Sequence, residues 1–137
     1  LHASGIELML DVPDELPWLL GDPVRIELAL LNLIKNSLDA MPDGGHVTVS
    51  ARAVADGTRI EVADTGPGIP EGLVDRIFDA WVTTKPIGEG TGLGLAFTRE
   101  VILAHGGSIA VETTPGQGAT FIIGLPGKTG SPAIHEV

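Results

Sequence analysis

The sequence contains no cysteine, so neither a disulfide framework nor a thiolate metal site is available to it. Basic residues are also scarce: 8 lysines and arginines stand against 18 acidic residues, which gives a formal charge of −10. Nucleic acids and anionic membrane surfaces bind clustered Lys and Arg side chains, so neither is an expected partner. The lack of cysteine suits a reducing compartment, and we expect a cytoplasmic location.

Long hydrophobic runs are missing too. The most apolar stretch, residues 28–38, is interrupted by two asparagines and a lysine, and it is too short and too polar to span a bilayer. The 137-residue chain has 43% hydrophobic residues, enough to bury the core of one ordinary domain. We predict one domain over residues 1–126 and a polar, proline-containing tail or linker over residues 127–137. Because the chain begins with leucine, we expect it to come from a longer polypeptide.

Hydrophobic patterning predicts strands that alternate with helices. Alternating apolar residues indicate strands at 6–12, 46–53, 58–64, 108–114 and 119–126. Helical spacing indicates a helix from Pro23 to about residue 41, a short helix over 71–78 and a helix over 92–104. Together these elements predict an α/β fold, a two-layer sandwich whose mixed, mostly antiparallel sheet carries about three helices on one face.

A glycine-rich segment, GEGTGLGLAF at residues 88–97, precedes the last predicted helix. It is not a Walker loop, because Leu95 and Ala96 stand where that loop needs a lysine and a hydroxyl. It is not a dinucleotide fingerprint either, because its glycines recur at every second position and no strand precedes it. Glycines and a helix N-terminus still allow close approach to a phosphate. A flexible loop that binds nothing is the alternative.

A polar stripe runs along the predicted helix at residues 23–41. Asn32, Lys35, Asn36 and Asp39 follow helical spacing, and Arg25 lies on the same side. A solvated helix face is the ordinary interpretation of such a stripe. However, asparagine is a poor helix former, and two amide oxygens one turn apart are able to hold a hard cation directly or through water.

The segment DTGPGIP, residues 64–70, ends a predicted strand with an acid and continues through two glycines. Asp64 is either an ordinary turn cap or a carboxylate that accepts a hydrogen bond from the exocyclic amine of a bound ring. In the second interpretation, Gly66 and Gly68 leave room for a flat ring. A ring without the amine would leave the carboxylate unpaired, at a cost of about 1–3 kcal/mol.

Five segments in fixed order resemble the catalytic and ATP-binding domain of sensor histidine kinases. LLNLIKNSLDAM resembles the N box, DTGPGIP the first glycine box, IFDAWVTTK the F box, GEGTGLGL the second glycine box and PGQGATF the final glycine-containing strand. Each segment is weak alone, but the set covers residues 28–126. The resemblance implies the Bergerat fold of the gyrase, chaperone, histidine kinase and mismatch-repair ATPases. LDAM and VTTK resemble the nitrogen-regulator and oxygen-sensor subgroup.

The resemblance implies ATP and Mg²⁺ as ligands and assigns roles to single residues. Asn36 corresponds to the magnesium ligand, Asp64 to the acid that recognises adenine, and Lys85 to a cation near the terminal phosphate. Asn32 and Lys85 are the implied catalytic residues, and Phe78 is the F-box aromatic, for which a plain core role is an equal alternative. The implied nucleotide-binding set is Asn32, Asn36, Asp39, Asp64, Gly66, Gly68, Ile69, Thr83, Thr84, Lys85, Gly88, Gly90, Thr91, Gly92, Leu93, Gly94 and Thr120, with Thr120 supporting the pocket of the acid.

One departure from the hydrolytic relatives points to the reaction. They carry a glutamate where this chain has Asn32, and an amide cannot take a proton at neutral pH, so hydrolysis loses its base. Phosphoryl transfer to an imidazole needs mainly positioning and charge neutralisation. The resemblance therefore implies a protein-histidine kinase. A hydrolytic ATPase, a serine kinase of the same superfamily and a non-catalytic nucleotide-sensing module are the alternatives.

The four histidines of the chain do not follow the helical His-Glu pattern of a phosphoacceptor. We interpret His46 as a strand surface residue and His105 as a helix C-terminal residue. The implied acceptor is a histidine on a dimerisation domain of the same polypeptide, and a response regulator receiver domain is the implied downstream partner. The whole protein is expected to be a homodimer.

Overall fold

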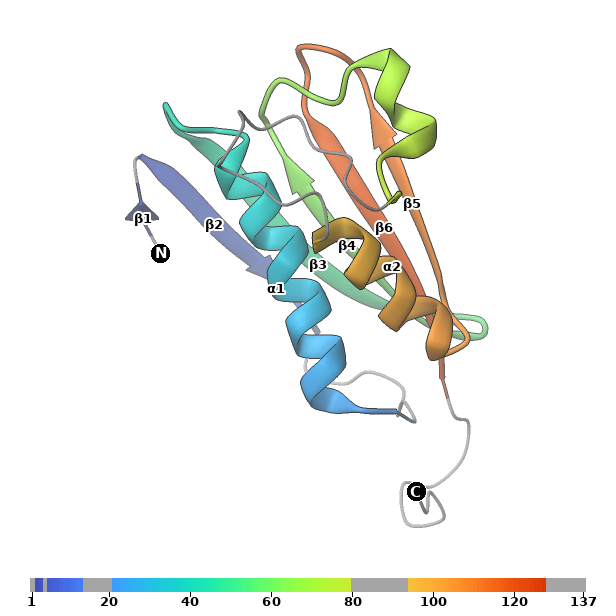
Figure 1. Ribbon diagram of the computed structural model, residues 1–137. Coiled ribbons are helices and arrows are strands. Elements are labelled where there is room, and N and C mark those ends of the chain that lie inside the picture. The colour runs from blue at the N-terminus through green and yellow to red at the C-terminus, as the bar shows by residue number, and fades with distance from the viewer. Residues whose placement is uncertain (1, 4, 14–20, 80–93, 128–137) are drawn as a thin grey trace.

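The computed structural model describes residues 2–3, 5–13, 21–79 and 94–127. These residues form a two-layer α/β sandwich in which a six-stranded sheet carries helices on one face (Figure 1). The strands are β1 (His2–Ala3), β2 (Ile6–Asp11), β3 (Gly45–Val54), β4 (Gly57–Asp64), β5 (Ser108–Thr113) and β6 (Ala119–Pro126). The helices are α1 (Pro23–Asp39), the 3-10 helix η1 (Glu71–Arg76) and α2 (Gly94–Ala104). The predicted fold class is confirmed.

The sheet is mixed, with the strand order β1-β2-β3-β4-β6-β5. Strands β2 and β3 are parallel, whereas the other neighbouring pairs of described strands are antiparallel. A parallel pair needs a crossover connection, and α1 provides it by returning across the sheet between β2 and β3. The C-terminal end of α1 therefore leads directly to the start of β3.

Helix α1 begins where the sequence predicts it. The Oδ1 atom of Asp22 accepts hydrogen bonds from the amides of Val24, at 3.0 Å, and Arg25, at 3.2 Å, and Pro23 occupies the first turn. The buried side of the helix presents Ala29, Leu33 and Ser37 to the interior. The helix ends at Asp39, before the predicted boundary at residue 41, and the next amide, of residue 40, still bonds to the helix.

The hydrophobic core lies between the helices and the sheet. Alternation along β6 directs Ala119, Phe121, Ile123 and Leu125 into it. Phe78 is half-buried and packs its ring edge-on against Phe121, with the ring centroids 6.0 Å apart. Phe78 therefore makes a core contact, which is one of the two interpretations of the F-box aromatic given above.

Helices α1 and α2 lie side by side on the sheet and approach each other through small residues (Figure 1). Ala29 of α1 and Thr98 of α2 are completely buried. The hydroxyl of Thr98 lies within hydrogen-bonding distance of the Ala29 carbonyl, at 3.2 Å, and of the Gly94 carbonyl, at 3.1 Å. This contact holds the first turn of α2 against the middle of α1.

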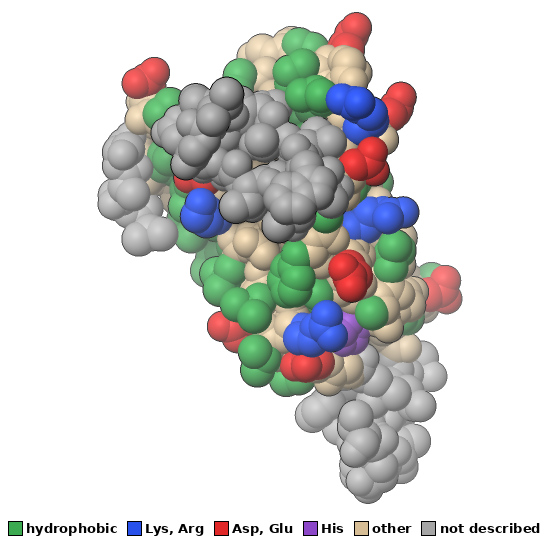
Figure 2. Space-filling model, viewed as in Figure 1, with side chains coloured by type: hydrophobic (Ala, Val, Ile, Leu, Met, Phe, Trp, Pro, Cys, Tyr) green, Lys and Arg blue, Asp and Glu red, His purple; other side chains and the backbone are tan. Residues whose placement is uncertain are grey.

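The outward face of α1 is less polar than the sequence predicts. Val24, Leu28 and Leu31 follow one another at i, i+4 and i+7, and each is about half exposed or more. Figure 2 shows hydrophobic side chains on this face of the molecule. An exposed apolar stripe therefore lies beside the predicted polar stripe, so the helix is not divided simply into an apolar and a polar side.

The other boundaries differ from the predictions by small amounts. The predicted helix over 71–78 is the 3-10 helix η1, which ends at Arg76. Strands β2 and β5 each end one residue earlier than predicted, while β3 and β4 each begin one residue earlier. Helix α2 is described from Gly94, and residues 92 and 93 of the predicted helix lie outside the described residues. Of the predicted tail, 127–137, only residue 127 lies inside them.

Candidate functional site

Asp64 is the last residue of β4, and two backbone amides fix its carboxylate. Its Oδ1 atom accepts hydrogen bonds from the amide of Gly66, at 2.9 Å, and from the amide of Ala119, at 3.3 Å. Within the described part of the chain, no hydrogen bond reaches Oδ2 of this half-buried side chain. A carboxylate accepts up to about four hydrogen bonds, so Asp64 is oriented by the backbone and keeps acceptor capacity for a ligand.

The turn that follows Asp64 is fixed to its surroundings at several points. The Thr65 amide donates to the His46 carbonyl, at 3.1 Å, and the His46 amide donates to the Thr65 hydroxyl, at 3.0 Å. On the other side, the carbonyl of Pro67 accepts from the Gly116 amide, at 2.7 Å, and the Ile69 amide donates to the Thr113 hydroxyl, at 2.9 Å. The turn is therefore held between β3 and the connection from β5 to β6.

Gly68 has a packing role in this turn. Its φ angle is +78°, and an added Cβ would lie 2.8 Å from the Thr114 carbonyl oxygen and 2.9 Å from the Thr113 hydroxyl. Protein atoms therefore occupy the space on the side of Gly68 where a side chain would project. The space at Gly66 is bordered differently, because an added Cβ there would lie 3.2 Å from Asp64 Oδ1 and 3.0 Å from the Met41 side chain.

The C-terminal end of α1 packs against the same turn. Met41 accepts a long hydrogen bond from the Thr65 hydroxyl through its sulfur, at 3.7 Å, and borders Gly66. Asn36 lies one turn earlier, and its carbonyl accepts the amide of residue 40 at 3.1 Å. The structure thus places Asn36 and Asp64 at the same end of the molecule, on the two elements that meet at Gly66.

The two asparagines differ from the charged members of the polar stripe. Asn32 and Asn36 are half-buried, whereas Arg25, Lys35 and Asp39 are exposed. A Cβ added to Gly94 would lie 3.7 Å from Asn32 Oδ1, so Asn32 sits beside the first turn of α2. The amides of that turn give this end of the helix a partial positive charge. Asn32 therefore lies at the junction of α1 and α2, and the charged residues of the stripe are exposed to solvent.

Asp39 takes part in a surface ion pair. Lys35 Nζ lies 2.9 Å from Asp39 Oδ2, one helical turn away, and the Lys35 side chain is 68% exposed. Exposed pairs of this kind contribute about 0.3–0.5 kcal/mol. For Asp39 the structure shows the helix-surface arrangement that the sequence analysis gave as the ordinary interpretation of the stripe.

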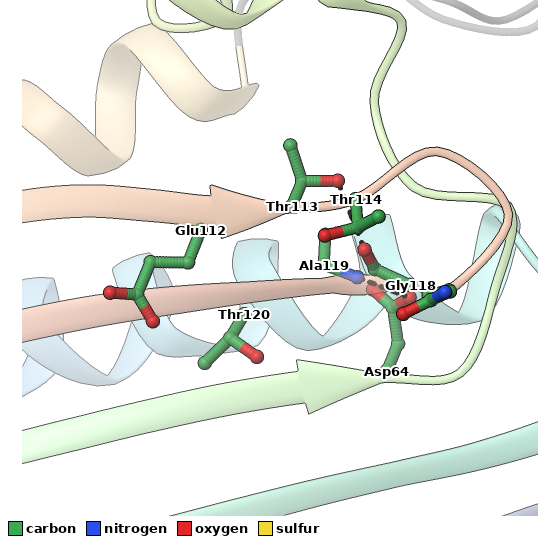
Figure 3. Close-up of a pocket in the computed structure, with 8 residues that line it drawn as sticks. Asp64, Glu112, Thr113, Thr114, Gly118, Ala119 and Thr120 are labelled. Carbon is green, nitrogen blue, oxygen red and sulfur yellow. Dashed lines mark hydrogen bonds between the residues drawn. The ribbon is translucent and has the colours of Figure 1, made fainter.

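A shallow hollow of about 190 Å³ lies where β4 ends and β5 turns into β6 (Figure 3). Its lining is polar and consists of Asp64, Glu112, Thr113, Thr114, Gln117, Gly118, Ala119 and Thr120. Thr120 pairs with Ala63 on one side and Glu112 on the other, and alternation turns it away from the buried face that holds Phe121. Thr120 nevertheless lines the same hollow as Asp64, so its supporting role stays a prediction. The direct hydrogen bond to the Asp64 carboxylate from β6 comes from the backbone amide of Ala119.

Many predicted nucleotide contacts fall outside the residues that the structure describes. These are Thr83, Thr84, Lys85, Gly88, Gly90, Thr91, Gly92 and Leu93. Ile69 is described, is 8% exposed and belongs to the core cluster. The structure therefore places Asn32 beside Gly94, and the end of α1 that follows Asn36 beside Gly66 and Asp64, so that three separate segments of the chain contribute.

A magnesium site that used Asn36 would have to be of the kind that depends on the nucleotide. Among the described residues, no cluster of three His, Cys, Asp or Glu side chains is present that could hold a metal ion alone. Mg²⁺ commonly takes only one or two protein oxygens and completes its shell with phosphate oxygens and water. A half-buried amide oxygen is a suitable single ligand in such a shell.

Sequence reasoning missed the contact made by Ala119 and the unpaired hydroxyl of Ser37. Ala119 contacts Asp64 through its backbone amide, so its side chain gives no signal in the sequence, and only its position after Gly118 does. Ser37 is completely buried on the inner side of α1, yet its hydroxyl has no hydrogen-bond partner among the described residues. A serine on an otherwise apolar helix stripe, directly after Asn36, was the available signal.

A carboxylate at a strand end, opposite an asparagine-bearing helix and a second helix N-terminus, defines a nucleotide-binding α/β sandwich. Residues 21–129 match the family described as histidine kinase-, DNA gyrase B-, and HSP90-like ATPase. The chain belongs to this family. Within the family it corresponds to the catalytic, ATP-binding domain of sensor histidine kinases.

Individual relatives support this assignment. The alginate biosynthesis sensor protein KinB of Pseudomonas aeruginosa is 42% identical over 125 residues, which is 91% of this chain and 21% of KinB. Full-length ShkA, solved in complex with AMPPNP, is 37% identical with a TM-score of 0.81, over 96% of this chain and 27% of ShkA. The mycobacterial sensor histidine kinase MprB is 32% identical with a TM-score of 0.77, over 90% of this chain and 83% of the MprB chain.

The chain thus spans about a quarter or less of the length of KinB and ShkA. The similarity concerns one domain of those larger proteins. In the described ranges, no helix combines the length and the apolarity that crossing a membrane requires.

Proposed function

We propose that this chain binds MgATP and transfers the γ-phosphoryl group to a histidine on a dimerisation domain of the same polypeptide. The observation that carries the proposal is the state of Asp64. Two amides hold its Oδ1 atom, and no described residue bonds to Oδ2. The exocyclic amine of adenine is the donor that suits this oxygen. The AMPPNP complex of ShkA supports nucleotide binding by a chain of this fold.

The asparagines of α1 take the phosphate side of the proposed site. Asn36 would supply an amide oxygen to Mg²⁺, and Asn32 lies beside Gly94, where the α2 amides favour negative charge. Magnesium would supply charge neutralisation on the phosphate oxygens. Lys85 and the glycines at 88, 90 and 92 complete the set as sequence predictions.

An amide at position 32 favours transfer over hydrolysis. Hydrolysis needs a group that takes a proton from water, and Asn32 cannot act as that base. An imidazole nitrogen attacks the γ-phosphorus with its own lone pair while the bond to the β–γ bridging oxygen breaks and ADP leaves. The protein then needs only to orient the reactants and to stabilise charge.

The partners of the whole protein follow from the same proposal. They are the histidine-bearing dimerisation domain, a second copy that forms a homodimer, and a downstream response regulator receiver domain. The segments LDAM and VTTK favour the nitrogen-regulator and oxygen-sensor subgroup, and the lack of cysteine favours a cytoplasmic domain.

The test is a MgATP titration of this chain followed by mixing with a histidine-bearing dimerisation domain. We expect an acid-labile phosphohistidine on the added domain and little phosphate release by the chain alone. Steady phosphate release without phosphohistidine would favour a hydrolytic ATPase. Nucleotide binding with neither product would favour a nucleotide-sensing module.

A further inference from the structure

Thr98 is one of three completely buried residues of α2, and the other two, Val101 and Ile102, are apolar. Its hydroxyl lies 3.1 Å from the Gly94 carbonyl, one turn earlier in the same helix, and 3.2 Å from the Ala29 carbonyl of α1. A bond to the carbonyl four residues earlier is common for a threonine in a helix and needs no second helix. The contact with Ala29 is different, because it joins the two helices.

This interhelical contact lies one turn away from the residues that the proposed function places at the phosphates. Asn32 follows Ala29 by three residues on the same side of α1, and Gly94 begins α2. A Cβ added to Gly94 would lie 3.7 Å from Asn32 Oδ1. Two neighbouring contacts, Thr98 with Ala29 and Gly94 with Asn32, therefore set the distance between the helices at this point.

A second hydrogen bond joins the other ends of the same two helices. His105, the residue after α2, accepts the amide of Asp22, the cap of α1, through Nε2 at 3.0 Å. The contacts follow opposite orders along the two helices, so α1 and α2 run antiparallel. The pair is therefore tied at two points, and the Thr98 hydroxyl is the point nearer to Asn32.

We propose that Thr98 is a positioning residue for phosphate binding: its hydroxyl holds the first turn of α2 at the distance from Asn32 that the phosphates of the nucleotide require. This inference rests on the proposed function. The partial positive charge of a helix N-terminus falls off within the first turn, so a small shift of that turn changes its attraction for a phosphate. Thr98 is buried and acts only through the groups that it holds in place.

Thr58 on β4 provides a matched control. It is 2% exposed, and its hydroxyl has no hydrogen-bond partner among the described residues. It pairs with Ala53 and Leu125 near the start of β4. The change from threonine to valine can therefore be made at two buried positions, one where the hydroxyl joins two helices and one where it joins no described group.

The experiment measures dissociation constants for MgATP and for adenosine, which has no phosphate, and the unfolding temperature, in the full chain and its variants. We expect Thr98→Val to weaken MgATP about tenfold and to leave adenosine within about twofold of the parent. Thr98→Ser keeps the hydroxyl and should bind both ligands like the parent, and so should Thr58→Val. Both Thr98 variants should lower the unfolding temperature by about 4 °C, because one loses a hydrogen bond and the other a buried methyl group. Stability therefore does not separate them, whereas affinity does. Thr98→Ala also removes the hydroxyl, without adding a methyl group against the carbonyls, and repeats the test should Thr98→Val not fold.

Several results would overturn the inference in distinguishable ways. Unchanged MgATP affinity in Thr98→Val would show that the hydroxyl positions nothing. A loss in Thr98→Ser as large as that in Thr98→Val would assign the effect to packing instead of the hydrogen bond. Equal losses for MgATP and adenosine, or a matching loss in Thr58→Val, would show a general effect on the fold. Failure of the parent chain to bind MgATP would refute the proposed function itself, and this inference with it.

Discussion

The two ends of the sheet are built alike but differ in which hydrogen-bonding groups they leave without a partner. At one end, called here the Asp64 end, β4 finishes beside the C-terminal end of α1. At the other end, called the Thr58 end, β4 begins near the start of α1 and the end of α2. Each end contains a glycine that allows no side chain: an added Cβ would lie 2.1 Å from a carbonyl oxygen at Gly118 and 2.4 Å at Gly107. Tight packing therefore does not distinguish them.

Both ends also contain an aspartate whose Oδ1 atom accepts two backbone amides. Asp22 does so at the start of α1, and Asp64 does so after β4. Asp22 is exposed, so water satisfies its second oxygen, whereas Asp64 is half-buried. The same local geometry thus makes a helix cap at one end and, at the other, holds the carboxylate that we propose to bind adenine.

The histidine at the Thr58 end completes the contrast. The Nε2 atom of His105 accepts the Asp22 amide at 3.0 Å, and Nδ1 donates to the Val101 carbonyl at 2.8 Å. Both ring nitrogens are therefore used within the protein, which joins the end of α2 to the start of α1. Spare hydrogen-bonding capacity, more than burial or close packing, separates a ligand site from a structural joint.

The largest expected effect is on stability at the Asp64 end. Gly118 has a φ angle of +97°, and an added Cβ would overlap the Asp64 carbonyl oxygen. We expect Gly118→Ala to lower the free energy of unfolding by about 3 kcal/mol, measured by urea denaturation, from backbone strain plus overlap. The matched control is Gly116→Ala, where φ is +81° but no atom lies within 4 Å, so only the backbone cost of about 1 kcal/mol applies. Equal losses in the two variants would contradict the close packing described for Gly118.

A smaller effect, on nucleotide affinity, is expected from replacing Asn36 at the same end of the molecule. Asn36→Ala removes the proposed magnesium ligand from a half-buried position. We expect ATP affinity to fall about tenfold in the presence of Mg²⁺ and to change little in EDTA, measured by calorimetric titration, because only the metal-bound complex uses the amide. The same loss in both buffers would refute a ligand role.

The smallest effect on binding is expected at the Thr58 end. His105→Ala leaves the Asp22 amide without its acceptor, so the unfolding free energy should fall by about 1 kcal/mol. Nucleotide affinity should stay within about twofold of the parent, because that joint lies at the far end of the helices from Asp64. A large loss of affinity with unchanged stability would break the comparison between the ends.

The sequence predicted elements better than it predicted their arrangement. Alternation and turn glycines located β3, β4 and β6, and the Asp22–Pro23 pair located the start of α1. These are local signals, which depend on neighbours in the chain. The strand order and the parallel pairing of β2 with β3 depend on the crossover by α1. No local pattern specifies them.

The same distinction applies to the site. The end of α1 that carries Asn36 lies at the same end of the sheet as Asp64, and the roles of both side chains stay predictions from the family boxes. The support of Asp64 by Ala119 was missed because a backbone amide is identical in every residue but proline. The packing role of Gly68 was also missed, because a glycine that makes room for protein and one that makes room for a ligand look alike in sequence.

The central claim is that the spare oxygen of Asp64 recognises the exocyclic amine of adenine. Its most direct test compares the affinities of the parent chain and of Asp64→Asn for ATP and for inosine triphosphate, in which a carbonyl oxygen replaces the amine. Because a carboxylate only accepts, we predict that the parent prefers ATP by at least about tenfold. The asparagine NH₂ donates instead, so the variant should lose or reverse this preference while remaining folded. Equal affinity of the parent for both nucleotides, or an unchanged preference in the variant, would contradict the account.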